Sequence, residues 1–272
     1  MLLVGVGRAV SSDVVMPDVG AGTVLFAGDW HGDHRAAWDA CRAAEVAGCA
    51  VVVQLGDFGV WSGRNGAHYL DEVSKAAVRH GVTVCFIDGN HENFDLLLAV
   101  DTDPATGLRE LRERVMHIPR GSRWTWCGVR FAALGGATSL DRPGRVESVS
   151  WWPQEALTYS QARTFAEDGP VDVLLTHDCP QGVSIPGIDP LTSLRMWPET
   201  ELRVAWAHRE LLAQVCEQVS PLRLLHGHFH VRYDAQVTLW SRPTLVSGLA
   251  DQDGGDGNRL VVNVAQISGH TL

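Results

Sequence analysis

The sequence lacks any apolar run of the roughly 20 residues that a membrane-spanning helix needs. Its N-terminus also lacks the basic stretch followed by a long apolar segment that marks a secretory signal. There are no internal repeats, linkers or low-complexity tracts, and 45% of the 272 residues are hydrophobic. We therefore expect a soluble, cytoplasmic protein with one domain over residues 1–272, favoured over two small domains. Residues 1–22 are expected to add an edge strand or to form a loose N-terminal extension.

Cysteine is sparse: the six cysteines are scattered, and no two form a Cys-x-x-Cys pair. This spacing argues against a zinc ribbon or a redox motif. Most of them lie in apolar runs, which predicts reduced core residues of a cytosolic protein.

Basic residues are few: the sequence has 22 of them and 32 acidic residues, so the net charge is -10. Binding to nucleic acid normally requires a basic face, so the composition gives no strong nucleic-acid signal. An acidic site that recruits metal cations fits this balance, although a solvated acidic surface fits it equally well.

The sequence does contain a regular alternation of apolar strands and helices in its first third. The predicted order is strand 23–27, helix 34–48, strand 50–55, helix 68–80 and strand 82–87, with a glycine-bearing loop over 60–66. This alternation indicates a parallel sheet built of right-handed crossovers. Ligands of such sheets collect outside the carboxyl ends of the strands.

The remainder of the chain alternates less regularly. The predicted elements are a helix over 94–115 broken near Asp103-Pro104, a hairpin over 123–134, a helix opening at 151–155, a strand over 171–176, an irregular stretch over 181–198, a helix over 199–219, a strand over 222–225, and two or three further strands after 232, separated by the acidic loop 251–257.

Five of the predicted strands end in side chains that can bind metals. These are Asp29 with His31, Asp57, Asn90 with His91, His177, and His228 with His230. In an extended segment residues i and i+2 point to the same side, so Asp29 and His31 can reach one point together. Carboxylate oxygens and imidazole nitrogens are good ligands for divalent transition metals. Each of these motifs alone is weak evidence for a metal site, but their repetition in five places predicts a metal centre.

These blocks resemble the calcineurin-like metallophosphoesterase superfamily over roughly residues 23 to 265. The family order is Asp-x-His, Gly-Asp, Gly-Asn-His-Glu/Asp, a lone His and Gly-His-x-His, which here are Asp29-Trp30-His31, Gly56-Asp57, Gly89-Asn90-His91-Glu92, His177 and Gly227-His228-Phe229-His230. The segment from Gly135 to Glu155 is similar to a bacterial and phage branch. The implied fold is an α/β fold, a four-layer α/β/β/α sandwich with mixed sheets.

The resemblance implies two divalent metal ions, with Mn²⁺ the expected occupant and Fe or Zn²⁺ as alternatives. The implied ligands are Asp29, His31 and His230 for the first metal, Asn90, His177 and His228 for the second, and Asp57 for both. His91 would be the catalytic acid that protonates the departing alcohol.

The implied activity is hydrolysis of a small phosphoester by in-line attack of a metal-bridging hydroxide. Phosphoprotein phosphatases of the superfamily continue the second block with Asp-Arg-Gly, whereas this chain reads Gly56-Asp57-Phe58-Gly59-Val60-Trp61-Ser62. The acidic partner of the catalytic His and the phosphate-binding Arg are missing there, and Arg64 is a speculative substitute. We therefore expect a phosphodiesterase with some phosphomonoesterase activity. A serine/threonine protein phosphatase is the alternative, and an inactive binding module is disfavoured because every ligand position is filled.

Several nearby residues have a simpler interpretation than a role in the site. His68, His80, His117 and His208 are expected to be surface residues or satisfied helix residues, and His226 to be structural. Asp33 fits a helix cap or an outer group of the site. For Trp30 and Trp61, core packing and a pocket wall are equally expected. The sequence leaves the substrate-binding residues unknown.

Overall fold

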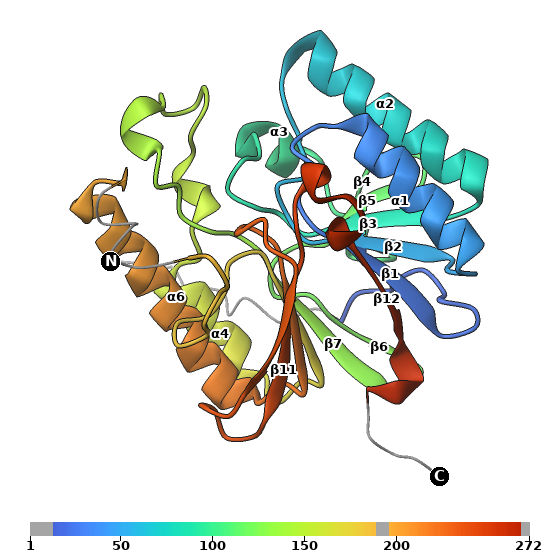
Figure 1. The fold of residues 1–272 in the computed structure, drawn as a ribbon. Coiled ribbons are helices and arrows are strands. Elements are labelled where there is room, and N and C mark those ends of the chain that lie inside the picture. The colour runs from blue at the N-terminus through green and yellow to red at the C-terminus, as the bar shows by residue number, and fades with distance from the viewer. Residues whose placement is uncertain (1–12, 189–195, 268–272) are drawn as a thin grey trace, which may run out of the picture.

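Two mixed sheets face each other at the centre of the protein, and helices cover their outer faces (Figure 1). The computed structural model describes residues 13–188 and 196–267. Each sheet has six strands, of which the inner ones run parallel and the edge strands antiparallel. The α/β prediction with mixed sheets is confirmed.

The first sheet contains the three strands predicted in the first third of the chain. Its order is β12 (Arg259–Asn263), β1 (Thr23–Ala27), β2 (Val51–Gln54), β3 (Thr83–Phe86), β5 (Val115–His117) and β4 (Arg109–Arg112). Strands β1, β2, β3 and β5 are parallel, as the crossover pattern predicts. Both faces of β2 are buried, which is why it is an unbroken run of valines rather than an alternating sequence.

The second sheet is built from the second half of the chain. Its order is β10 (Tyr233–Val237), β11 (Thr244–Gly248), β9 (Arg223–His226), β8 (Val173–Thr176), β7 (Val129–Leu134) and β6 (Arg123–Trp126). The predicted hairpin over 123–134 is the antiparallel pair β6–β7. The predicted tail strands are β10, β11 and β12.

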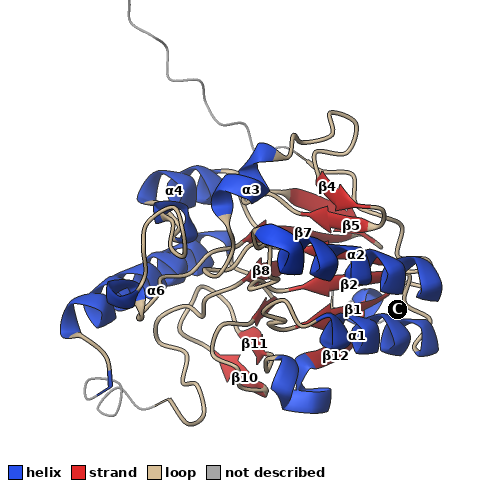
Figure 2. Ribbon diagram, turned by 90° about the horizontal axis from the view of Figure 1, so that it is seen from above, coloured by secondary structure: helices blue, strands red, loops and turns tan. Residues whose placement is uncertain are grey.

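The helices form the two outer layers, as Figure 2 shows from above. Helices α1 (His34–Val46) and α2 (Gly63–His80) cover the first sheet, while α4 (Tyr159–Glu167) and α6 (Glu199–Val219) cover the second. One apolar cluster lies under each helix pair and a third lies between the sheets. On β1, for example, Leu25 packs toward the helices, whereas Val24 and Phe26 pack between the sheets. The layer order is therefore α/β/β/α, as predicted.

Local chemistry explains where two of these helices begin. The side chain of Asp33 accepts a hydrogen bond of 2.8 Å from the backbone N–H of Arg35, so Asp33 is the cap of α1. At α4, Thr158 and Gln161 form a capping box. The predicted helix opening at 151–155 is wrong, because Pro153–Glu155 forms only a 3₁₀ turn before this cap.

The largest correction concerns residues 94–115. Only α3 (Phe94–Ala99) is helical there, and the rest of the predicted broken helix contains the strands β4 and β5. Strand β5 pairs in parallel with β3, so pairing with the sheet overrides the helical spacing of the apolar residues. Helix α2 also begins at Gly63, five residues before the predicted start and within the predicted loop 60–66.

The predictions for the irregular segments are tested only in part. Residues 1–12, 189–195 and 268–272 lie outside the described residues. Within the described part, Asp13 forms an isolated bridge with Arg123, and Val14 and Val19 pack between the sheets. Residues 181–188 contain no helix or strand. Among the described residues, no helix is long and apolar enough to cross a membrane.

Candidate metal centre

The loops that follow β1, β2, β3, β8 and β9 meet at one edge of the two sheets and carry every predicted ligand. The structure gathers six of these side chains into two groups, in each of which one ligand atom per residue lies within 4.8 Å of the others. The groups are Asp29, His31 and His230, and Asp57, His177 and His228. Below they are called the outer group and the inner group.

Asp57 lies between the two groups and contacts both. Its Oδ2 is 3.3 Å from Nε2 of His31, and its Oδ1 is 3.4 Å from Nε2 of His177. Oδ1 also accepts hydrogen bonds of 2.8 Å from the backbone N–H groups of Asn90 and His91. These bonds fix the carboxylate, so that one oxygen faces each group.

Asn90 completes the inner group through its side-chain oxygen. Oδ1 lies 3.1 Å from Nε2 of His177, while Nδ2 donates a hydrogen bond of 3.0 Å to Oγ of Ser139. Ser139 in turn donates to Glu155, at 2.7 Å. The amide nitrogen is thus occupied on the far side, and the oxygen is directed into the group.

Asp29 is fully buried at the floor of the outer group. Its two carboxylate oxygens each lie 3.1 Å from the backbone nitrogen of His228, which donates to them. Oδ2 is also 3.1 Å from Nε2 of His230. Gly227 must be glycine here, because a Cβ at this position would collide with the Asp29 carboxylate. The Gly-His-x-His block therefore packs directly against the Asp-x-His block.

Three of the candidate ligand histidines place an Nδ1 atom against an oxygen. In His177, Nδ1 lies 2.7 Å from the carbonyl oxygen of Leu55. In His31 it lies 2.8 Å from Oε1 of Gln252, and in His230 it lies 3.2 Å from Oδ2 of Asp251. Because these oxygens only accept, each Nδ1 carries the proton, and the lone pair of a neutral ring lies on the Nε2 that faces the group. This is how protein metal sites commonly orient imidazole ligands.

The charge of the centre attracts cations. Burial by itself lowers the pKa of His177, but the carboxylates of Asp57 and Asp29 outweigh it and raise that pKa to about 10. The same balance of burial against Asp57 raises the pKa of His31 to about 9. A field that stabilises positive charge here also favours a divalent cation, and the mixed oxygen and nitrogen donors suit a transition metal. The residues therefore fit the two metals that the sequence implies.

Four of the candidate ligands have a left-handed backbone. The φ angles are 44° at His31, 53° at Asp57, 66° at His228 and 57° at His230. Such angles are uncommon outside glycine and cluster at functional sites, where the surrounding structure enforces them. Here they turn the chain sharply after each strand, so that the next side chain faces the centre.

His91 lies beside the two groups without joining either of them. Its Nε2 is 3.9 Å from Oδ2 of Asp57, and burial lowers its pKa. The Nη2 atom of Arg145 lies 2.6 Å from Nδ1 and 3.0 Å from Nε2 of the same ring. Asp141 holds Arg145 through a hydrogen bond of 2.9 Å. On its Nδ1 side, away from Asp57, His91 thus faces an arginine rather than an acidic partner.

The comparisons with known proteins agree with this geometry. The family model described as calcineurin-like phosphoesterase matches residues 22–232. The chain belongs to this family. This phosphoesterase is therefore a metal-dependent hydrolase of phosphoesters. No curated protein matches it.

Two solved structures show the same fold as this phosphoesterase. The protein TT1561 of Thermus thermophilus is 13% identical with a TM-score of 0.50, over 90% of this chain and 99% of that chain. A dimetal phosphatase from Danio rerio is 16% identical with a TM-score of 0.52, over 85% of this chain and 88% of that chain. At this identity the likeness concerns the fold alone.

Sequence reasoning missed several residues around the metal centre of this phosphoesterase. Arg145 comes from the loop after the 3₁₀ turn Arg142–Gly144, and Arg64 instead lies exposed on α2. Only the tertiary structure brings Arg145 to His91, so no local pattern could have identified it. For Asp251 and Gln252 the sequence predicts only a place in an acidic loop, whereas their side chains contact His230 and His31.

Glu92 was also missed, although it belongs to the Gly-Asn-His-Glu block. Its carboxylate accepts hydrogen bonds from the backbone N–H groups of Phe58, Gly59 and Val60, at 2.7, 3.1 and 2.8 Å. Burial and the charge of Asp57 raise the pKa of Glu92 to about 7. Glu92 thus fixes the loop that carries Asp57.

Three further histidines, His117, His208 and His226, are buried and have polar partners. His226 is buried, with Nε2 2.7 Å from the Tyr233 hydroxyl, and His208 is a buried helix residue 2.7 Å from Asp178. His117 is neither on the surface nor in a helix as predicted, because it lies buried in β5 with Nε2 3.3 Å from Asp88.

The two tryptophans beside the motifs differ. Trp30 is fully buried in the core under α1 and α2. Trp61 is 40% exposed, and its Nε1 donates a hydrogen bond of 2.9 Å to the His91 carbonyl oxygen. Trp61 and His91 both line a cavity of about 440 Å³, so the pocket-wall prediction applies to Trp61 alone.

Proposed function

We propose that this phosphoesterase hydrolyses small phosphodiesters, with weaker activity on monoesters. The outer group together with Asp57 would hold one divalent cation, and the inner group together with Asn90 would hold the other. Mn²⁺ is the proposed occupant, with Fe or Zn²⁺ as alternatives. Bound there, the two ions would supply Lewis-acid charge and lower the pKa of a coordinated water.

The residues of the chain have distinct tasks in this proposal. Asp57 holds the spacing of the two groups, because each of its oxygens faces one of them. His91 gives a ring proton to the departing alcohol oxygen, a role worth about 10²- to 10⁴-fold in rate. Arg145 binds a phosphoryl oxygen, since its guanidinium already lies against the His91 ring.

The cavity beside His91 is the observation that carries the preference for diesters. Among the described residues, Arg145 is the only lysine or arginine in its lining, and Trp61, Val149 and Trp152 supply apolar walls. A phosphodiester bears one negative charge and a second organic group, and both match this lining. The second organic group would lie against Trp61.

Three substrates test the proposal: bis(4-nitrophenyl) phosphate, 4-nitrophenyl phosphate and a phosphoserine peptide, each with Mn²⁺. We expect kcat/KM to be highest for the diester and lowest for the peptide. Dominant turnover of the peptide would instead support a serine/threonine protein phosphatase. A protein that binds Mn²⁺ but hydrolyses none of the three substrates would contradict the proposal.

Arg145→Gln tests the binding of the phosphoryl group, with Arg142→Gln, in the preceding 3₁₀ turn, as a matched control. Arg142 is half-exposed and stacks over Trp151 rather than His91. We expect Arg145→Gln to lower kcat/KM for the diester by about 10- to 100-fold, because a charge-assisted hydrogen bond is lost. An equal effect in both variants would refute this role for Arg145.

A further inference from the structure

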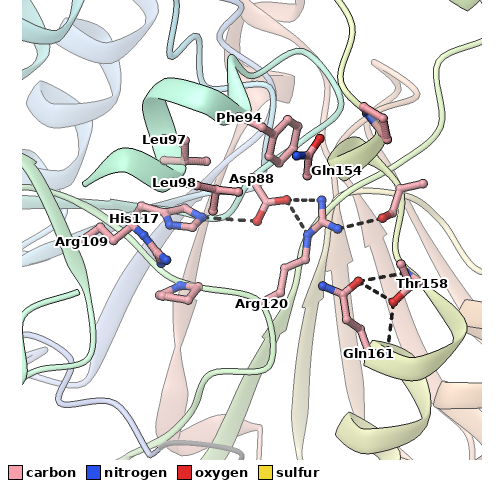
Figure 3. A pocket seen from close by; sticks show the side chains of 13 residues that line it. Asp88, Phe94, Leu97, Leu98, Arg109, His117, Arg120, Gln154, Thr158 and Gln161 are labelled. Atoms are coloured by element: carbon pink, nitrogen blue, oxygen red, sulfur yellow. Dashed lines mark hydrogen bonds and ion pairs between the residues drawn. The ribbon is translucent and has the colours of Figure 1, made fainter. Parts of the chain in front are cut away.

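A second cavity lies outside the metal centre, between the end of β3, the β4–β5 pair, α3 and the segment that leads into α4 (Figure 3). Its volume is about 480 Å³, which is in the range of sites for small molecules. None of the seven candidate ligands lines it, and neither does His91. The family comparison gives this cavity no function.

Most charges in this cavity are already paired. Asp88 accepts a hydrogen bond of 2.7 Å from Nε of Arg120 and lies 3.3 Å from Nε2 of His117. Arg120 also donates to the backbone oxygens of Ala156 and Glu155, at 3.0 and 2.8 Å. The dashed lines in Figure 3 trace the bonds of Asp88 and Arg120. This network satisfies the carboxylate and the guanidinium without any ligand.

Two buried polar atoms of the lining have no partner, one on Arg109 and one on His117. Among the described residues, the guanidinium of Arg109 makes no hydrogen bond or ion pair, and its Nε is buried and unpaired. The Nδ1 atom of His117 is likewise buried and unpaired, in a side chain that is 2% exposed. A buried polar atom left in this state is costly in a folded protein and calls for an explanation.

These two groups are neighbours. Arg109 and His117 stand directly opposite each other in the β4–β5 pair, where facing side chains are about 5 Å apart. The Asp88 carboxylate can only accept, so Nε2 of neutral His117 carries the proton and Nδ1 is an acceptor. Among the described residues, the lining thus places a cation without an ion pair beside an acceptor without a hydrogen bond, and its one carboxylate and two guanidiniums sum to a net positive charge.

The other side of the cavity is apolar. Phe94, Leu97 and Leu98 of α3 face it together with Pro119 and Pro153 (Figure 3). Leu98 is 48% exposed, so the apolar lining extends to the surface and the cavity is open to solvent. A ligand would therefore need an apolar body as well as a polar end.

We propose that this cavity binds a small organic acid whose carboxylate stands beside a hydroxyl group on an aromatic or similarly apolar body. The carboxylate pairs with the Arg109 guanidinium, and the hydroxyl donates to Nδ1 of His117. The apolar body lies along α3. This arrangement satisfies both unpaired groups and covers the apolar lining. The site is separate from the phosphodiester site and does not depend on the proposed function.

The probe for this site is 3-hydroxy-2-naphthoate, titrated calorimetrically into the metal-loaded enzyme. We expect saturable 1:1 binding. The affinity should fall about tenfold or more for 2-naphthoate, which lacks the hydroxyl, and for 2-naphthol, which lacks the carboxylate. Equal affinity for all three compounds, or no binding of the probe, would overturn the proposal.

Two variants locate the bound probe. Arg109→Gln should weaken binding about tenfold or more, whereas Arg112→Gln, on the same strand but paired with Asp71, should not change it. Leu98→Glu should also weaken binding, because it places a negative charge at the exposed edge of the cavity. Trp61→Ala should leave the affinity unchanged, and a loss there would assign the probe to the cavity beside His91 and refute the second site.

Discussion

The outer and inner groups of the metal centre have similar donors but different surroundings. In the outer group the side chain of His230 is 43% exposed and that of His31 is 22% exposed. In the inner group His177 is fully buried and Asp57 is 2% exposed. The difference indicates that solvent reaches the outer group and that the protein encloses most of the inner one.

The supports of the two groups differ as well. His31 and His230 are held by Gln252 and Asp251, which lie beyond the end of the family match at residue 232. The inner group is held by the Leu55 carbonyl oxygen and by Ser139. We conclude that the inner group depends on the core of the fold, while the outer group depends on a C-terminal loop.

Asp57→Asn should have the largest effect, because both groups lose the charge that they share. Asn tolerates the left-handed backbone at this position, so the fold should persist. We expect kcat/KM for the diester to fall about 10³- to 10⁴-fold, and the content of both metals to fall with it. Elemental analysis and circular dichroism would check this, and loss of only one metal would show that the bridging assignment is wrong.

His91→Ala should come next, with a fall in kcat of about 10²- to 10³-fold and no change in metal content. The side chain joins neither group, so this variant separates proton donation from metal binding. The loss should be largest for a poor leaving group such as an alkyl alcohol. If an alkyl ester and a nitrophenyl ester lost rate equally, His91 would not be the proton donor.

Gln252→Ala should weaken the outer cation site alone, by about 10- to 100-fold in affinity, because His31 loses the partner that orients its ring. Titration of the metal-free protein with Mn²⁺ would resolve a weak and a strong site. Asp256→Ala, exposed on the same loop and paired with Arg259, is the control and should change neither site. Equal weakening of both sites would contradict the inference that different residues hold the outer and the inner group.

The rates at which the two cations are released should differ by the smallest factor among these predictions. After addition of a chelator, we expect one cation to leave about tenfold faster than the other, and we assign the faster release to the outer group. Stopped-flow measurement with a chromogenic chelator would resolve the two phases. A single phase would mean that the exposure of His230 has no bearing on metal exchange.

Features determined by local chemistry could be predicted from the sequence. The valine run of β2 and the Asp33 cap of α1 depend on neighbouring residues, and both lie where the pattern places them. The candidate ligands could be found because each follows a strand whose end faces the same edge of a sheet. Whether each side chain binds a metal stays a prediction.

Features determined by distant contacts could not be predicted. Residues 109–117 form strands because β3 lies beside them, although the spacing of their apolar residues resembles that of a helix. Arg145 reaches His91 across 54 positions of sequence, and His117 meets Asp88 across 29. No short pattern contains either pair, so only the folded chain reveals them.

The left-handed turns at His31, Asp57, His228 and His230 limit how this centre can evolve. Of the residues with a strong donor atom, Asp, Asn and His accept such a backbone most readily, whereas branched side chains are strongly disfavoured there. Mutations that keep both the turns and a donor atom are thus restricted to side chains that bind through an oxygen or an imidazole nitrogen. A change of metal preference would have to arise from the neighbouring loops, because the backbone leaves little freedom to exchange the donors themselves.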